Sequence, residues 1–464
     1  MRAIEIADLD SRLAADNPWW EAGADVIQTS GFRQRACLAK AQARSANGLP
    51  TLITGPRRSG KSILLRQIAA DALTNGTEPH DLLILRGDSL LNDDTFFSTT
   101  IERFMTNRGS ETTPRPVLLI DDIHCLPEWE ILLEETSHRY PTARVTATSA
   151  APPILAPPSF ERIHMPPVTF FEFMQFREAA DGAQIRFDDE QNAIAVASMA
   201  QINQAFVEYL NFGGMPEAAF SGHRSLDAIY PGRQAYLDGV LRQYLPILFG
   251  INNPQELQRI FQILAHNSGE EISIEHLAEL GGVAKNTIRK YLDFLGATYQ
   301  LQRLDKFDPM TGPYARARKF KLYLTDPSAH AALFGPVGEG AEATRLVESA
   351  ILAAALLRPA GTELYYGLWK RREVPFIALT GPSRNKSRAY FYLDWAATEE
   401  TQLDGYARLA NFPPEALGPE PYVEIFTQSL SAATEFDGVE VRFTPAALYC
   451  WEMGRQAALD WPVF

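Results

Sequence analysis

The sequence has few cysteines, and this scarcity excludes two classes of stabilised protein. Only Cys37, Cys125 and Cys450 occur in 464 residues, and they lie far apart. Three widely spaced cysteines supply neither a disulfide framework nor a four-cysteine zinc site. We expect all three to be buried or half-buried free thiols.

Long apolar segments are absent as well. The apolar runs are short, as at residues 117–120 and 350–357, and none approaches the ~20 residues that span a bilayer. The N-terminal residues alternate charged and apolar side chains and lack the apolar core of a signal peptide. These absences predict a cytoplasmic protein without a membrane partner.

The motifs of two hydrolase classes are also missing. No pair among the eight scattered histidines has the spacing of a zinc protease site, and no GxSxG elbow occurs. We expect all eight histidines to be structural or at the surface. A content of 46% apolar and 22% charged residues is typical of globular proteins, and the length is typical of two to four domains.

Negative charge predominates, with an uneven distribution. The formal net charge is −14, which does not suit a protein that coats nucleic acid. Residues 285–388 are the exception, with 17 basic and 9 acidic side chains, whereas residues 171–284 carry 6 and 15, and residues 389–464 carry 3 and 12. This basic block either contacts the phosphate backbone of DNA or docks on the acidic segments or on a partner protein.

Buried strands alternate with helices in the first third of the chain. Apolar runs typical of strands lie at residues 51–54, 81–86, 117–121, 143–148 and 162–165, and segments with helical periodicity lie at 62–73, 95–105 and 129–140. This alternation predicts an α/β fold with a parallel sheet that is covered by helices on both faces.

A phosphate-binding loop follows the first of these strands. Residues 55–62 (GPRRSGKS) fit GxxxxGK[ST] at every fixed position, between a predicted strand and a predicted helix. The glycines let successive N–H groups converge on phosphates, Lys61 supplies a charge to the β- and γ-phosphates, and Ser62 supplies a hydroxyl to Mg²⁺. The predicted site for nucleoside triphosphate and Mg²⁺ comprises Gly55, Pro56, Arg57, Arg58, Ser59, Gly60, Lys61 and Ser62.

Two carboxylates follow the third strand, at the edge of the sheet where the P-loop also lies. We expect Asp121 to hold Mg²⁺ through water and Asp122 to polarise the attacking water. Thr148 ends the fourth strand and is a candidate for orienting that water, or else a locally satisfied hydroxyl. Arg162 precedes the fifth strand and is a candidate arginine finger if copies of the chain form a ring, or else a surface side chain.

The rest of the chain divides into three predicted parts. Residues 170–250 are helical, with a break at Gly213-Gly214. Residues 251–335 have the order of a winged helix, and residues 336–464 read as a small α/β domain. If the winged helix binds duplex DNA, the contacts come from Lys285, Arg289, Lys290, Arg318 and Lys319.

At this point the sequence resembles a large prokaryotic group of AAA-type ATPases that carry an uncharacterised nuclease-like C-terminal domain. The resemblance covers residues 30–380 and is carried by GPRRSGKS, LLIDDIHCLPEW, FERIHMPPVTFFEF, YLNFGGMPEAAF, TIRKYLDFLGATYQLQRL, KFKLYLTD and RLVESAIL. It implies ATP as the nucleotide and an AAA-type P-loop sheet of order 5-1-4-3-2. It also implies an ATPase core (49–169), a helical lid (170–250), a winged helix (251–335) and a restriction-endonuclease-like domain (336–464). The residues before the core, 1–48, read as short helices from their own pattern.

Two departures from the family pattern bear on activity. The family usually has Asp-Glu where this chain has Asp121-Asp122, and the shorter second side chain predicts slow hydrolysis. The family's C-terminal domain usually has a metal-binding Asp where this chain has Pro375, and a Lys where this chain has Ala396. Glu348 and what remains do not make a two-carboxylate metal site, so we expect no nuclease activity.

Two functional hypotheses follow. The first is an ATPase that couples hydrolysis of MgATP to movement of the lid and winged helix, on duplex DNA or through a change in a homo-oligomer. The second is a nucleotide-gated scaffold that turns over little ATP and holds an unknown protein partner.

Overall fold

The computed structural model divides the chain into two compact units, residues 1–166 with 463–464, and residues 167–462. It describes residues 11–459 except 12, 24–25, 28–31, 48–49, 91–93, 108–114, 152–159, 182–184, 189–192, 221–225, 309–311, 314–318, 339–340, 358–361, 370–371, 381–386, 396–421 and 437–438. Within these described residues, no helix is both long and apolar enough to span a membrane.

The first unit is built on a five-stranded parallel sheet. Its order is β2-β3-β4-β1-β5, which confirms the predicted order 5-1-4-3-2 read from the other edge. The strands are nearly continuous apolar runs because both faces of the sheet are buried. Their bounds are β1 (Thr51–Thr54), β2 (Leu82–Arg86), β3 (Val117–Asp121), β4 (Arg144–Ser149) and β5 (Glu161–His164).

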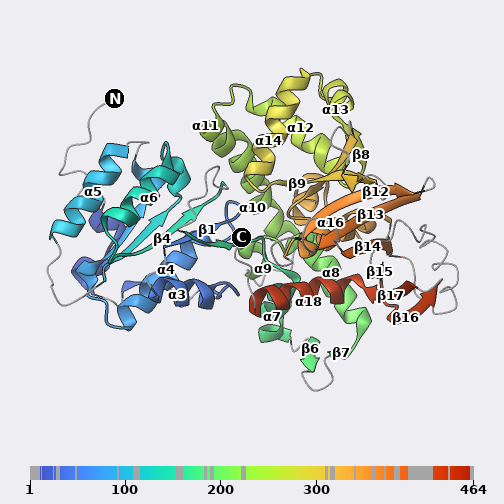
Figure 1. The fold of residues 1–464 in the computed structure, drawn as a ribbon, viewed down its shortest axis with the longest axis horizontal. Helices are drawn as coiled ribbons and strands as arrows, with labels where there is room; N and C mark the ends of the chain where they lie inside the picture. The colour runs from blue at the N-terminus through green and yellow to red at the C-terminus, as the bar shows by residue number, and fades with distance from the viewer. Residues whose placement is uncertain are drawn as a thin grey trace. The chain divides into compact units, whose positions relative to one another are not determined.

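Helices cover both faces of this sheet (Figure 1). Helices α3 and α4 pack on one face and α5 and α6 on the other, and the apolar residues between them form the core of the unit. The helices are α2 (Trp19–Ala22), α3 (Leu38–Ala46), α4 (Lys61–Thr74), α5 (Asp94–Asn107) and α6 (Trp129–Arg139), with short 3₁₀ turns at η2 (Pro79–Asp81), η3 (Gly87–Leu90) and η4 (Ile123–Cys125).

The N-terminal segment closes one edge of this sheet through side chains. The amide of Asn17 accepts the N–H of Ile84 at 2.6 Å and donates to the Ile84 carbonyl at 3.0 Å. The indoles of Trp19 and Trp20 donate to the carbonyl of Leu82 at 3.1 and 2.9 Å. Side-chain groups thus satisfy backbone groups of edge strand β2 that would otherwise be open to another strand.

The second unit contains one mixed sheet of ten strands. Its order is β16-β17-β15-β14-β13-β12-β9-β11-β8, and β10 pairs with β9. The strands are β8 (Glu271–Ser273), β9 (Leu301–Asp308), β10 (Gly312–Pro313), β11 (Lys319–Leu324), β12 (Glu363–Trp369), β13 (Arg372–Thr380), β14 (Ser387–Asp394), β15 (Tyr422–Thr427), β16 (Ala432–Phe436) and β17 (Val439–Pro445).

This sheet joins two parts that the sequence analysis separates. Strands β8, β9 and β11 belong to the predicted winged helix, and β12 begins the sheet of the predicted C-terminal domain. A parallel ladder of β9 and β12 pairs Asp305 with Tyr365 and Phe307 with Gly367. The ladder makes the two sheets continuous, which apolar periodicity along the chain does not reveal.

The helices of the second unit surround two cores. Helices α7 and α8 pack with α16 and α18, whereas α10 and α11 pack with α12, α13 and α14. The helices are α7 (Phe170–Asp181), α8 (Met199–Phe212), α9 (Pro216–Phe220), α10 (Leu226–Asp238), a π-helix η5 (Gly239–Tyr244), α11 (Leu245–Phe249), α12 (Pro254–His266), α13 (Ile274–Gly281), α14 (Lys285–Ala297), α15 (Ser328–Phe334), α16 (Ala341–Ala355) and α18 (Ala446–Leu459). The predicted lid segment therefore contributes to both cores.

In residues 170–250, one prediction from the sequence is confirmed and another is wrong. The predicted break at Gly213-Gly214 is confirmed, since α8 ends at Phe212 and α9 begins at Pro216. A hairpin of β6 (Ile185–Asp188) and β7 (Ala193–Val196) interrupts the segment that was expected to be wholly helical. Both hairpin strands are only four residues long, too short to give a clear alternating pattern.

Candidate functional site

The P-loop connects the carboxyl end of β1 with the amino end of α4, as the sequence predicts. Gly60 precedes α4 with a φ of 102°, a left-handed conformation that favours glycine. Gly55 lies against the backbone of the residue after β5, because a Cβ built on it would be 2.0 Å from the carbonyl oxygen of Met165. The local backbone structure thus explains why glycine occupies both of these fixed positions of the motif.

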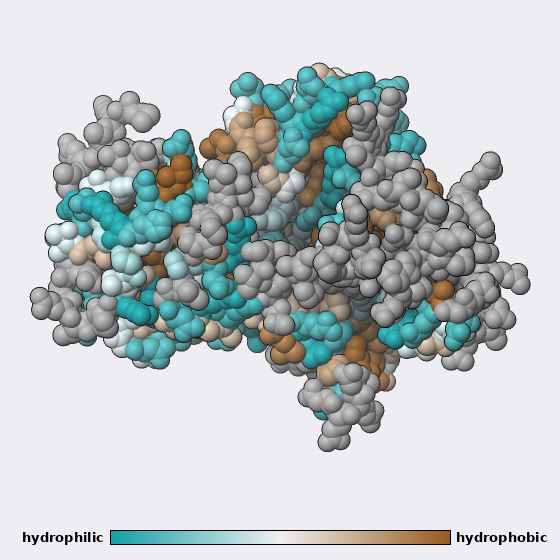
Figure 2. Space-filling view, in the orientation of Figure 1, coloured by the Kyte–Doolittle hydropathy of each residue, from teal (hydrophilic) through white to brown (hydrophobic). Residues whose placement is uncertain are grey.

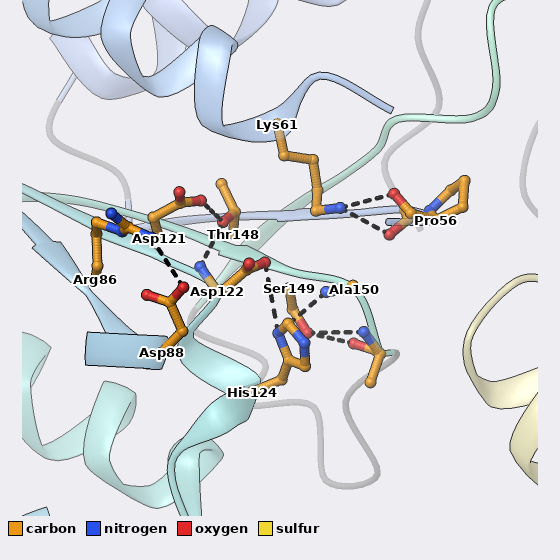
Figure 3. A network of polar contacts seen from close by, with 12 residues as sticks. Pro56, Lys61, Arg86, Asp88, Asp121, Asp122, His124, Thr148, Ser149 and Ala150 are labelled. Atoms are coloured by element: carbon orange, nitrogen blue, oxygen red, sulfur yellow. Dashed lines mark hydrogen bonds and ion pairs between the residues drawn. The ribbon is translucent and has the colours of Figure 1, made fainter. Parts of the chain in front are cut away.

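Lys61 is buried in this structure. Its ammonium donates to the carbonyl oxygens of Gly55 at 3.0 Å and Pro56 at 2.8 Å (Figure 3). Only 5% of the residue is exposed. Burial lowers the pKa of Lys61 to about 8, against the opposing effect of Asp122 and Asp121. In this structure the ammonium group is therefore hydrogen-bonded to carbonyl oxygens of its own loop.

Asp121 lies at the carboxyl end of β3, where its carboxylate accepts two side-chain hydroxyls. The Thr148 hydroxyl donates to it at 2.6 Å, and the Ser62 hydroxyl also bonds to it. Burial and the neighbouring Asp122 raise the pKa of Asp121, while these hydrogen bonds lower it. The structure thus brings together Ser62 and Asp121, the two predicted magnesium ligands.

Asp122 has a conformation that few side chains adopt. Its φ is 49°, in the left-handed region, and its backbone N–H donates to the Thr148 hydroxyl at 2.9 Å. Aspartate and asparagine tolerate this region better than other non-glycine residues. Backbone geometry therefore gives a reason for aspartate here, where the family pattern has glutamate.

Thr148 is fully buried in β4, and both capacities of its hydroxyl are used within the protein. The hydroxyl donates its proton to Asp121 and accepts the N–H of Asp122. We therefore expect it to position the two carboxylates, and its direct action on water remains a prediction. These local hydrogen bonds agree with the second role considered for Thr148, a strand-end hydroxyl that is satisfied within the protein.

His124 belongs to this cluster, although the sequence analysis assigned no histidine to it. Its Nδ1 accepts the N–H of Ala150 at 3.2 Å and lies 3.9 Å from an Asp122 oxygen (Figure 3). Burial, followed by the charges of Lys61 and Arg57, lowers the pKa of His124 to about 3. The neutral imidazole thus ties the loop after β3 to the residue after β4.

The stability of the first unit is expected to fall as the pH drops below about 6.5. A histidine that stays neutral when folded gains a proton on unfolding, so its contribution is complete above its unfolded pKa and declines toward the folded pKa of about 3. The slope is about 1.4 kcal/mol per pH unit for one group. His164 in β5 contributes in the same direction, because burial lowers its pKa to about 4. Urea unfolding of His124→Gln at pH 7 and pH 5 should therefore show a smaller slope than wild type, and the exposed His138→Gln should retain the wild-type slope. Equal slopes in all three proteins would contradict the assignment.

Arg162 lies inside β5 instead of before it. It pairs with Leu52, two positions before the pair of His164 with Thr54 that immediately precedes the P-loop. Half of this short strand therefore separates Arg162 from the loop end of the sheet. Its role as an arginine finger remains a prediction.

Several basic side chains of the basic block pair with acidic residues of the second unit. Glu271 accepts Lys306 at 3.1 Å and Lys319 at 3.0 Å, and Glu275 accepts Lys285 at 3.2 Å. Arg345 pairs with Glu270, and the buried Lys321 pairs with Glu373. Three of these acids lie in the acidic segment 171–284, as the docking alternative requires.

The exposed face of α14 carries the remaining candidates for DNA contact. Arg289 and Lys290 are exposed, and Arg289 donates to Asn286 at 2.7 Å. The described surface over α13 and α14 is mainly hydrophilic (Figure 2). Arg318 lies outside the described residues. A pocket of about 370 Å³ beside this helix is lined by Ile274, Glu275, Arg289, Leu292, Asp293, Arg303 and Phe320.

Comparisons with known proteins agree with this geometry in the first unit. A sequence profile of a family described as an AAA domain matches residues 47–174, and one of a domain of unknown function (DUF8612) matches residues 203–338. An uncharacterised protein of Haemophilus influenzae is 21% identical over an alignment of 338 residues that covers 70% of this chain and 78% of that protein. The profile match and the sheet order together assign an AAA-type P-loop ATPase fold to the first unit.

Two solved structures show more distant similarity. A Walker-type ATPase of Pyrococcus abyssi is 12% identical, with a TM-score of 0.40, over 65% of this chain and 95% of that one. AMPPCP-bound DnaA from Aquifex aeolicus is 13% identical, with a TM-score of 0.27, over 58% of this chain and 91% of that one.

Proposed function

We propose that this protein binds MgATP at the P-loop of its first unit and hydrolyses it slowly. The convergence of Lys61, Ser62, Asp121, Asp122 and the P-loop backbone at one edge of the parallel sheet carries this proposal. A calorimetric titration with MgATP, together with an assay of phosphate release, tests it. Absence of both binding and turnover in the folded protein would refute it.

The residues present suit a triphosphate. Helix α4 has no side-chain cap at its amino end, so its first N–H groups are available to an anion. The Ser59 hydroxyl is buried and has no hydrogen-bond partner among the described residues. A phosphate oxygen at the loop supplies an acceptor for such groups, and Lys61 adds the charge once it leaves the carbonyls of Gly55 and Pro56.

The residues present also suit Mg²⁺. A serine hydroxyl and an aspartate carboxylate are the hard oxygen donors that this ion prefers, with water and phosphate oxygens as its other ligands. Ser62 and Asp121 would hold it, and it would neutralise charge on the transferred phosphoryl group. Thr148 keeps the Asp121 carboxylate in place through its hydrogen bond.

Asp122 is the group proposed to take part in hydrolysis. Its carboxylate accepts a proton from, or orients, the attacking water, while its backbone is held by Thr148 and its side chain lies beside neutral His124. The aspartate side chain is one methylene shorter than the glutamate of the family pattern, and we expect slow turnover for that reason.

We further propose that residues 251–335 act as a winged helix that contacts duplex DNA. The order α12, β8, α13, α14, β9, β11 supports this proposal, with α14 as the recognition helix. Ser273 caps α13 by accepting the N–H of His276, and Gly282 ends it in a left-handed conformation, so the helix-turn-helix is defined by local signals.

Charge reversal on α14 tests the DNA proposal. Arg289→Glu with Lys290→Glu should weaken duplex binding more than Arg186→Glu, an exposed arginine on β6. Wild-type affinity should fall with salt at a slope of about −0.9 per phosphate contact. Basal ATP hydrolysis should be unchanged in both variants. If the wild-type protein does not bind DNA at ~50 mM salt, where attraction is strong, the basic block is a docking surface.

A second candidate function is a nucleotide-gated scaffold with little turnover. The ion pairs that Glu270, Glu271 and Glu275 make with the basic block favour it, because they reduce the positive charge offered to DNA. The steady-state ATPase rate with and without DNA separates the two functions. An unstimulated, very slow rate supports the scaffold.

The C-terminal region is proposed to lack nuclease activity. Pro375 is buried in β13 and contributes no carboxylate, and Glu348 bonds to the Tyr323 hydroxyl. Within the described residues, no group of three or more acidic, histidine or cysteine side chains forms a metal site. Plasmid incubated with the protein and Mg²⁺ or Mn²⁺ should stay intact. Cleavage that Glu348→Ala removes would contradict this.

A further inference from the structure

The chain enters the second unit through two consecutive prolines that follow β5. Pro166 ends the first unit and Pro167 begins the second. On the far side, the N–H of Val168 donates to the carbonyl of Gly214 at 2.8 Å, and its carbonyl accepts the Tyr209 hydroxyl at 3.0 Å. Proline restricts φ to about −65° at both positions of this connection. We call residues 165–168 the crossover segment.

The P-loop touches the start of this crossover segment directly. The N–H of Met165 donates to the carbonyl of Thr54 at 2.7 Å, one residue before the P-loop. The Met165 carbonyl lies so close to Gly55 that any Cβ there would overlap it. A shift of the first P-loop residue therefore moves the backbone of Met165.

Arg35 makes a second link between the same two segments. One arm of its guanidinium donates to the carbonyl of Ser59 in the P-loop at 2.6 Å, and the other donates to the carbonyl of Pro166 at 3.0 Å. The residue is 4% exposed. A planar guanidinium with both arms engaged fixes the distance between its two acceptors, which a single ammonium does not do.

The P-loop has a reason to move when phosphates bind. In this structure Lys61 satisfies the carbonyls of Gly55 and Pro56. Phosphate oxygens compete for the same ammonium, and its departure leaves these two buried carbonyls without their donor. A nucleotide-bound arrangement of the loop would give this lysine different partners from those it has here, as in a two-state switch.

We propose that Arg35 is a positioning residue that couples nucleotide binding at the P-loop to the crossover segment and so to the second unit. This inference rests on the proposed nucleotide binding. The proposal gives a function to Arg35, which lies in the N-terminal segment and outside the P-loop motif. A bound nucleotide displaces the carbonyl of Ser59, the guanidinium follows it, and the Pro166 carbonyl follows the guanidinium.

Hydrogen exchange measures this coupling, because the crossover segment has amides on both sides of the prolines. The N–H of Met165 reports on the first unit, and the N–H groups of Val168 and Thr169 report on the second. Exchange is compared with and without a non-hydrolysable ATP analogue and Mg²⁺. The proteins are wild type, Arg35→Lys, Arg35→Met and, as a matched control, Arg33→Lys at an exposed arginine two residues away.

In wild type and Arg33→Lys, the analogue should change exchange at Val168 and Thr169 by about fivefold or more, the lower end of usual couplings. In both Arg35 variants the analogue should still slow exchange in residues 55–62 while the change at Val168 and Thr169 falls below about twofold. Melting temperatures establish that the variants are folded.

The other outcomes overturn the proposal in distinguishable ways. A wild-type response at Val168 and Thr169 in the Arg35 variants shows that Arg35 is merely structural. Loss of the response at residues 55–62 in these variants shows that Arg35 maintains the P-loop itself and does not couple it onward. No response at residues 55–62 in wild type refutes nucleotide binding, and the coupling with it.

Discussion

Lys61→Ala is expected to reduce MgATP affinity by about 100-fold or more, which removes binding from the range of a calorimetric titration. The ammonium supplies charge-assisted hydrogen bonds to phosphate, and each such bond contributes about 1.5–3 kcal/mol. No other lysine lies in the P-loop to replace it. Phosphate release should stop together with binding.

The burial of Lys61 requires a control for folding. The alanine variant leaves the carbonyls of Gly55 and Pro56 without the ammonium, at a cost of about 1–3 kcal/mol for a buried acceptor. Its melting temperature is therefore measured beside that of Arg66→Ala, which removes an exposed basic side chain from the same helix. A folded Lys61→Ala protein with wild-type affinity and turnover would refute the proposed nucleotide site.

Asp122→Asn is expected to lower the rate of ATP hydrolysis by about 10²–10⁴ with little change in MgATP affinity. Asparagine has the same shape and tolerates the left-handed φ of 49°, so the loop after β3 should be retained. The variant removes only the carboxylate that accepts a proton from water. Single-turnover assays separate this effect from product release.

Asp121→Asn is the matched comparison for Asp122→Asn. It removes the carboxylate bonded to Ser62 and Thr148, so nucleotide binding should lose its dependence on Mg²⁺. The two variants, one residue apart, should therefore have different defects. Asp122→Asn should slow the chemical step, and Asp121→Asn should weaken metal-dependent nucleotide binding. Wild-type hydrolysis by Asp122→Asn would show that another group activates the water.

The first sheet and its P-loop could be predicted from the sequence because the signals are local. Parallel strands buried on both faces are continuous apolar runs, and β1 (Thr51–Thr54) and β3 (Val117–Asp121) have the predicted bounds. The spacing of the motif determines the amino end of α4. The edge position of Asp121 follows from the parallel sheet, since carboxyl ends of parallel strands meet at one edge.

Contacts between distant segments could not be predicted in the same way. Arg35 reaches Ser59 and Pro166 across 24 and 131 positions of the chain, and no periodicity marks it. The charges that lower the pKa of His124 together with burial come from Lys61 and Arg57, far earlier in the chain, so its low pKa has no local signal. The pairing of β9 with β12 depends on which strands have an unpaired edge in the folded protein. The sequence of each strand alone predicts only that it belongs to its own sheet.

The ladder of β9 and β12 limits the ways in which this protein can act on a partner. A winged helix on a separate domain swings on its linker and searches for its target independently. Here the backbone pairs from Asp305 to Phe307 tie the proposed winged helix to β12, and the ion pair of the buried Lys321 with the exposed Glu373 on β13 adds a second link. The α14 face and the C-terminal sheet are consequently presented at one fixed spacing. A partner that engages both gains from their preorganisation, and one that needs them farther apart is excluded.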